Sequence, residues 1–95
     1  MYKLLLFLNK TNEENILNHF REFTIKQLTE AIGKEIKIGK IESSLLLEQK
    51  YSLFCEVTMD SKDEWNSKMT TKAGKEFNKD LTGFHKYITP IFIVY

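Results

Sequence analysis

Tyr2–Leu8, with the sequence YKLLLFL, would form a strand that is apolar on both of its faces. A strand that covers a single core alternates apolar and polar side chains, because successive side chains point to opposite faces of the sheet. In this stretch three leucines at the even positions point one way, while Leu5 and Phe7 point the other way. The stretch therefore predicts a strand between two apolar layers, and leaves open which set of side chains faces which layer.

Two helices are predicted from capping boxes and helical spacing of apolar residues. Thr11–Glu14 has the capping-box form, which predicts a helix from there to about Ile32, ended by Gly33 in a left-handed conformation. Ser61–Glu64 has the same form and predicts a second helix that ends near residue 81 or 84. Gly74 and the preceding threonine pair predict that this second helix is kinked or broken.

Three further strands are predicted over residues 35–47, 51–59 and 87–95. Gly39 is a candidate for a bulge in the first of them, and Pro90 favours an edge position for the last. The element order is then βαββαβ, which is the ferredoxin-like order of an α+β domain. Right-handed crossovers place both helices on one face of a four-stranded antiparallel sheet, with the first and third strands central. We expect residues 1–95 to form a single domain.

The sheet face away from the helices is predicted to be apolar. Leu5 or its neighbours, Phe54, Phe92 and Val94 are the candidates for this face. Such a patch is unusually large for a monomer, and a twofold-related copy would bury it in a two-sheet barrel. We therefore expect a homodimer through the open sheet face. The alternative is a monomer in which helix ends and loops shield the patch.

Composition limits the classes of partner and cofactor. The chain has 14 basic and 13 acidic residues and a formal net charge of +1, which predicts neither nucleic-acid nor membrane binding. The single cysteine, Cys55, fits a reducing compartment, and we expect a cytoplasmic protein. The sequence contains no metal-ligand cluster, phosphate-binding glycine loop or nucleophile motif, so no metal or other cofactor is predicted.

The second half of the chain resembles the EthD family, a group within the dimeric α+β barrel proteins. The resemblance lies in Thr71–Gly74, the pair Asp80–Leu81 and Phe84, and the opening Met1–Leu5 is similar to the family's first strand. It implies a homodimer with a cleft between helices and sheet, in a family linked to degradation of small organic compounds without one common reaction. The chain departs from the family at Thr24, which stands where a histidine often follows an aromatic residue by four positions.

A related branch of these barrels degrades haem and holds the iron with a histidine on the second helix. In this chain Lys75 stands near that position and cannot serve as the ligand. Asn9, at the end of the first strand, does resemble the polar strand residue of that branch.

Polar residues at positions where apolar ones are expected are the candidates for chemistry. Asp80 and His85 are the candidate acid–base pair, although Asp80 could instead cap the following loop and His85 could be a solvated loop residue. Thr24 and Gln27 interrupt the apolar stripe of the first helix, and with Asn9 they are candidates for orienting a ligand. Backbone hydrogen bonds are the alternative explanation for Thr24 and Gln27.

Aromatic residues supply the remaining candidates. Tyr51 and Trp65 could form an aromatic wall of the cleft, and core packing explains them equally well. His19 is interpreted as a surface residue at the margin of the stripe, and Cys55 as a small buried hydrophobic residue.

The sequence thus predicts a protein that binds or transforms a small, mainly apolar organic molecule in a cleft between helices and sheet. It does not decide whether a reaction is catalysed. The alternative function is a non-catalytic homodimeric binding or assembly module with a closed core.

Overall fold

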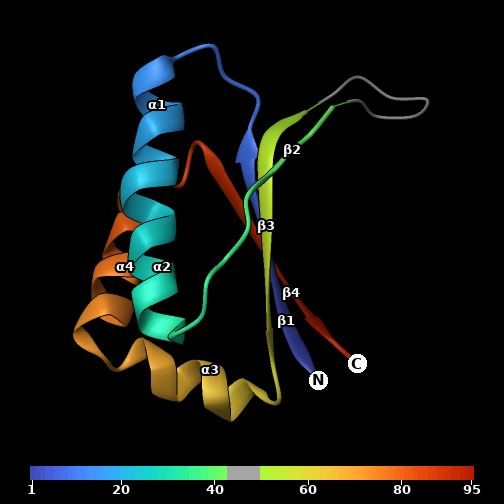
Figure 1. Cartoon of the computed structure of the whole chain (residues 1–95), viewed down its shortest axis with the longest axis vertical. Helices are drawn as coiled ribbons and strands as arrows, with labels where there is room; N and C mark the ends of the chain where they lie inside the picture. Colours follow the sequence, from blue (N-terminus) through green and yellow to red (C-terminus); the bar gives the residue numbers. More distant parts are fainter. Residues whose placement is uncertain (43–49) are drawn as a thin grey trace.

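Helices pack on one face of a four-stranded sheet in the computed structural model, which describes residues 1–42 and 50–95 (Figure 1). The sheet has the order β2-β3-β1-β4, and each pair of neighbouring strands is antiparallel. Its strands are β1 (Tyr2–Asn9), β2 (Gly39–Lys40), β3 (Tyr51–Met59) and β4 (Ile88–Val94). The predicted ferredoxin-like βαββαβ order is confirmed, with the first and third strands central. In the described part of the strand predicted over residues 35–47, up to residue 42, the structure has β2, and the predicted Leu45–Leu47 segment lies outside the described residues.

The first helical segment is one continuous run with a π-helical centre. It consists of α1 (Glu14–His19), the π-helix η1 (Phe20–Thr24) and α2 (Ile25–Ile32). Gly33 ends it with a φ of 79°, as predicted, because this left-handed conformation is one that glycine adopts without steric cost. The predicted capping box at its start does not form. Thr11 Oγ1 instead accepts a hydrogen bond from the Glu13 amide at 3.1 Å.

The second helical segment is broken in two, as the sequence predicts. Its parts are α3 (Lys62–Met69) and α4 (Lys72–Gly83). Ser61 Oγ accepts from the Glu64 amide at 3.2 Å, so the predicted N-terminal cap of α3 is confirmed. Thr71 caps α4 in the same way, since its Oγ1 accepts from the Gly74 amide at 3.1 Å. A threonine that caps a new helix explains why the chain turns between α3 and α4.

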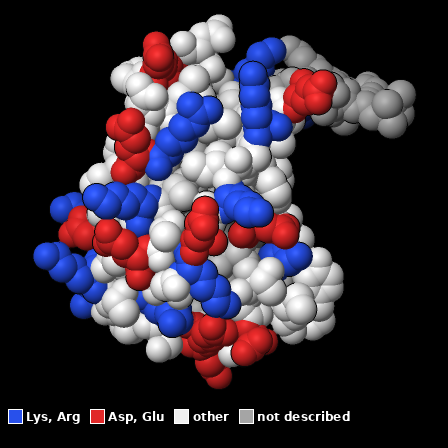
Figure 2. All heavy atoms as spheres, viewed as in Figure 1, with Lys and Arg blue, Asp and Glu red and all other residues white. Residues whose placement is uncertain are grey.

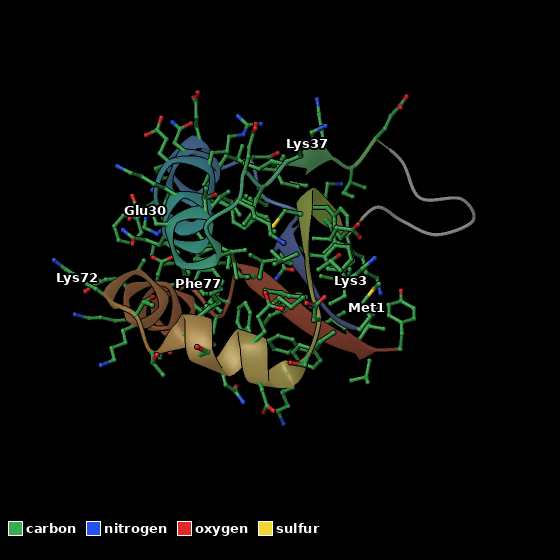
Figure 3. The ribbon with its side chains drawn as sticks, turned by 60° about the horizontal axis from the view of Figure 1, so that its bottom comes forward. Met1, Lys3, Glu30, Lys37, Lys72 and Phe77 are labelled. Carbon is green, nitrogen blue, oxygen red and sulfur yellow. The ribbon has the colours of Figure 1, made fainter. Side chains whose placement is uncertain are left out.

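The two faces of β1 have different neighbours. The side chains of Leu4, Leu6 and Leu8 are at most 1% exposed and belong to the core under the helices. Leu5 and Phe7 are half-buried and lie on the opposite face. Figure 3 shows Phe77 of α4 between helices and sheet, whereas Lys3 lies on the far side of the sheet.

Two residues predicted for the open face lie on the helix side instead. Phe92 pairs directly with Leu4, and Val94 pairs with Tyr2, and opposite residues of an antiparallel pair share a face. The Phe92 ring also contacts Trp65, with ring centroids 5.3 Å apart. Both residues are exposed because β4 is an edge strand. The residues that β4 contributes to the open face are therefore Thr89, Ile91 and Ile93.

Charged side chains of both signs are interspersed over the surface in the view of Figure 2. No helix in the described part of the chain is long and apolar enough to cross a membrane.

Candidate functional site

Asp80 of α4 joins two polar side chains of the first helical segment. Its Oδ1 lies 2.6 Å from Nε2 of His19, and its Oδ2 accepts a hydrogen bond from Thr24 Oγ1 at 2.5 Å. Thr24 is fully buried, and the side chain of Asp80 is 4% exposed. A buried carboxylate needs such partners because it has lost its hydration. Thr24 and Asp80, both singled out in the sequence, thus meet at one site.

The π-helix η1 is what allows His19 and Thr24 to share one carboxylate. In a regular α-helix, residues five apart lie about 140° apart around the axis, because there are 3.6 residues per turn. A π-helix bonds residue i to residue i+5, so residues five apart lie one turn apart on the same side. His19 directly precedes η1 and Thr24 is its last residue. Both side chains therefore reach Asp80. Single π-helical turns of this kind are frequent at functional sites.

The imidazole of His19 is held between two aromatic rings. Its centroid lies 4.0 Å from that of Phe84 and 5.1 Å from that of Phe23, and it is nearly parallel to both. Its side chain remains 28% exposed. When Nε2 carries the hydrogen and donates it to Asp80, the lone pair is on Nδ1, which has no hydrogen-bond partner within the described residues. This nitrogen can accept a proton from a bound molecule.

His19 lines a groove of about 340 Å³ between the first helical segment and α4. Asp80 and the apolar rings of Phe23 and Phe84 also line it, and Glu76 and Lys79 add charged side chains. A second hollow of about 700 Å³ also contains Phe23 and is lined by Gln27 as well, so the two lie next to each other along the helices. Glu30 and Lys72 of the second hollow point outward from the helix layer in Figure 3. The groove therefore lies between helices, whereas the sequence analysis expected a cleft between helices and sheet.

The structure does not bring His85 to Asp80. His85 is exposed after the end of α4, with its Nδ1 3.1 Å from the carbonyl oxygen of Thr82, and it does not line the groove. His19, and not His85, is the histidine that lies next to Asp80. The earlier interpretation of His19 as a surface residue is wrong, because its side chain is mostly covered and bonded to Asp80.

The side chain of Asn9 is hydrogen-bonded to β4 and to the loop before it. Its side-chain amide donates to the carbonyl oxygen of Lys86 at 3.1 Å, and its Oδ1 accepts from the Thr89 hydroxyl at 2.8 Å. These bonds fix the end of β1 against β4.

Tyr51 and Trp65 do not form a common wall. Trp65 is buried in the core against Phe77, whereas the Tyr51 ring packs on Phe7 of the open face, with centroids 4.6 Å apart. Regular strand alternation would place Tyr51 on the same face as Leu53, but an irregularity in the β1–β3 register at Leu8/Asn9 shifts it to the open face. Neither residue reaches the His19 groove.

Cys55 is buried in the core, as the sequence analysis expected. Burial raises the pKa of its thiol to about 12, so the thiol stays protonated and unreactive near neutral pH. In the part of the chain that the structure describes, no three His, Cys, Asp or Glu side chains are grouped to hold a metal ion.

Solved structures of other proteins have a similar fold. No protein-family model and no curated protein sequence matches the chain. A crystal structure of an EthD (ethyl tert-butyl ether D) family protein from Bacillus halodurans matches 100% of this chain and 98% of its own, with a TM-score of 0.81 and 23% identity. The chain has an EthD-like fold. The fold that the sequence resemblance implies is thereby confirmed.

A protein from Arabidopsis thaliana has a related structure. Its refined crystal structure matches 99% of this chain and 93% of its own, with a TM-score of 0.63 and 23% identity. Its solution structure, described as that of a hypothetical protein, has a TM-score of 0.54 and 22% identity, with coverage of 99% and 85%.

Proposed function

We propose that this EthD-like protein binds, and in the presence of a suitable substrate transforms, a small and mainly apolar organic molecule in the His19 groove. The observation that carries the proposal is a histidine stacked between two aromatic rings and anchored by a buried carboxylate. In this arrangement His19 is the proton carrier, Asp80 holds its tautomer and Thr24 holds Asp80. The groove volume of about 340 Å³ matches a ligand of a few heavy atoms. The EthD family name of the Bacillus halodurans protein supports the same class of small organic ligand.

The ligand site is tested with phenol and indole as aromatic probes, followed by amide and imidazole NMR signals. We expect saturable shifts at Phe23, Phe84 and the imidazole of His19, because these rings line the groove. His19→Ala should weaken probe binding by about tenfold or more, since a stacked and hydrogen-bonded partner is lost.

His85→Ala is the matched control, because His85 is also a histidine near the end of α4 but does not line the groove. It should leave probe binding unchanged. Equal weakening by both substitutions, or shifts confined to other surfaces, would contradict the proposal.

We further propose that the open sheet face joins two copies of the chain. This face presents an apolar patch in which the Phe7 ring contacts both Tyr51 and Phe54. Leu5 pairs with Ile91, whose side chain is 42% exposed, and so extends the patch onto the edge strand. A twofold-related copy would cover the patch with the same residues, because such an interface is self-complementary. The buried, unpaired Cys55 supports the cytoplasmic location expected for this assembly.

Phe7→Asp is expected to convert the dimer into a folded monomer, because it places a carboxylate at the centre of the apolar patch. Light scattering at micromolar concentration measures the mass, and circular dichroism shows that the monomer is folded. Val94→Asp is the control, because Val94 is 75% exposed but lies on the helix side of the edge strand. It should leave the dimer intact. A monomeric wild-type protein would contradict the assembly.

A further inference from the structure

A separate pocket of about 270 Å³ lies where the first helical segment faces the β2–β3 side of the sheet. Arg21 of η1 and Lys40 of β2, both exposed, line it together with Thr11 from the loop after β1 and Ser52 of β3. It shares no lining residue with the His19 groove. Neither function proposed above uses it.

The pocket is basic. Among the residues that the structure describes, no acidic side chain lines it, and neither Arg21 nor Lys40 has a carboxylate within 4.0 Å. Two cations that line one concave site both attract an anion that binds there. A guanidinium group is also well shaped to bind a carboxylate through two hydrogen bonds.

Hydroxyl groups add a donor at the same place. Ser52 Oγ accepts from the Thr11 amide at 3.3 Å and donates to the carbonyl oxygen of Asn9 at 3.4 Å, so it ties Thr11 to the sheet. Thr11 Oγ1 accepts from the Glu13 amide, and its own hydrogen has no acceptor within the described residues. Thr11 is thus held in place with a hydroxyl proton to donate to an anion.

Leu17 of α1 and Leu53 of β3 provide apolar surface in the same pocket. We propose that this pocket binds a small organic carboxylate, with its carboxylate at Arg21, Lys40 and Thr11 and its short apolar body against the two leucines. The basic groups select the charge, and the leucines favour an organic anion over an inorganic one.

The proposal is tested by titrating the whole protein with hexanoate, 1-hexanol and inorganic phosphate, with amide NMR shifts as the readout. Hexanoate should give saturable shifts at Thr11, Lys40 and Ser52 at millimolar concentration. Hexanol has the same apolar body without the charge, and phosphate has charge without the body, so both should bind at least about tenfold more weakly. The His19 groove is followed in the same spectra, so that failure of one site is distinguishable from failure of the other.

Arg21→Gln combined with Lys40→Gln should weaken hexanoate binding by about tenfold or more, because each loses a charge-assisted contact. Lys26→Gln is the control, because Lys26 lines the second hollow along the helices. The Lys40→Gln single variant gives an intermediate effect and guards against misfolding of the double variant. Binding that the double variant retains, or phosphate that binds as tightly as hexanoate, would overturn the assignment.

Discussion

Asp80→Ala is expected to lower the free energy of unfolding by about 3 kcal/mol, because a buried hydrogen-bonded pair loses one partner. The substitution removes both bonds that tie α4 to the first helical segment, those to His19 and Thr24. It also leaves the hydroxyl of Thr24, which is fully buried, without its acceptor. Urea unfolding followed by circular dichroism measures the change.

Combining Asp80→Ala with Thr24→Val isolates the part of the lost stability that comes from the Thr24 hydroxyl left without an acceptor. The double variant removes donor and acceptor together, so its loss should be smaller than the sum of the two single losses by about 1 kcal/mol. Thr82→Val is the control, because Thr82 is exposed on the same helix and its hydroxyl donates to the exposed Asn78 carbonyl oxygen and not to Asp80. It should change stability by less than about 0.5 kcal/mol. An Asp80→Ala variant as stable as the wild type would show that Asp80 does not hold the helices together.

The sequence was sufficient to identify part of this site. Thr24 and Asp80 stand out because polar side chains interrupt apolar helical stripes, and a buried polar group must have a partner. His19 is not evident from the sequence, because regular helical spacing places His19 and Thr24 about 140° apart around the axis. The π-helix that unites them has no sequence signature that reasoning from periodicity can detect. Phe23, in the same π-helical segment, lines the groove and is 38% exposed.

The fold followed more directly from the sequence, because it depends on strand alternation and helix caps that act locally. Leu4, Leu6 and Leu8 share a face in any strand, and Thr71 can cap α4 from its own position. Errors arose where pairing between distant segments decides the outcome. The register shift at Leu8/Asn9 depends on the partner strand, and the side on which Phe92 lies depends on its pairing with Leu4.

The corner between α3 and α4 depends on the absence of a side chain at Gly74. A Cβ at this position would lie 2.4 Å from the carbonyl oxygen of Lys68 and 2.5 Å from the Cα of Met69. Both are backbone atoms, so no side-chain rotation can relieve the contact. Gly74 is buried and its amide is bonded to Thr71, which fixes its place in the first turn of α4. Any larger residue must therefore push α3 and α4 apart.

Gly74→Ala is accordingly expected to destabilise the protein by about 3 kcal/mol, at the upper end for overpacking, because backbone meets backbone. Gly83→Ala is the matched control, since it makes the same change in the same helix where a Cβ meets nothing within 4 Å. Alanine is favoured over glycine in helices, so Gly83→Ala should raise stability by up to about 1 kcal/mol. Thermal and urea unfolding of both variants measure the opposite signs. If Gly74→Ala matched Gly83→Ala, the α3–α4 corner would have to be looser than the backbone contacts at Gly74 require.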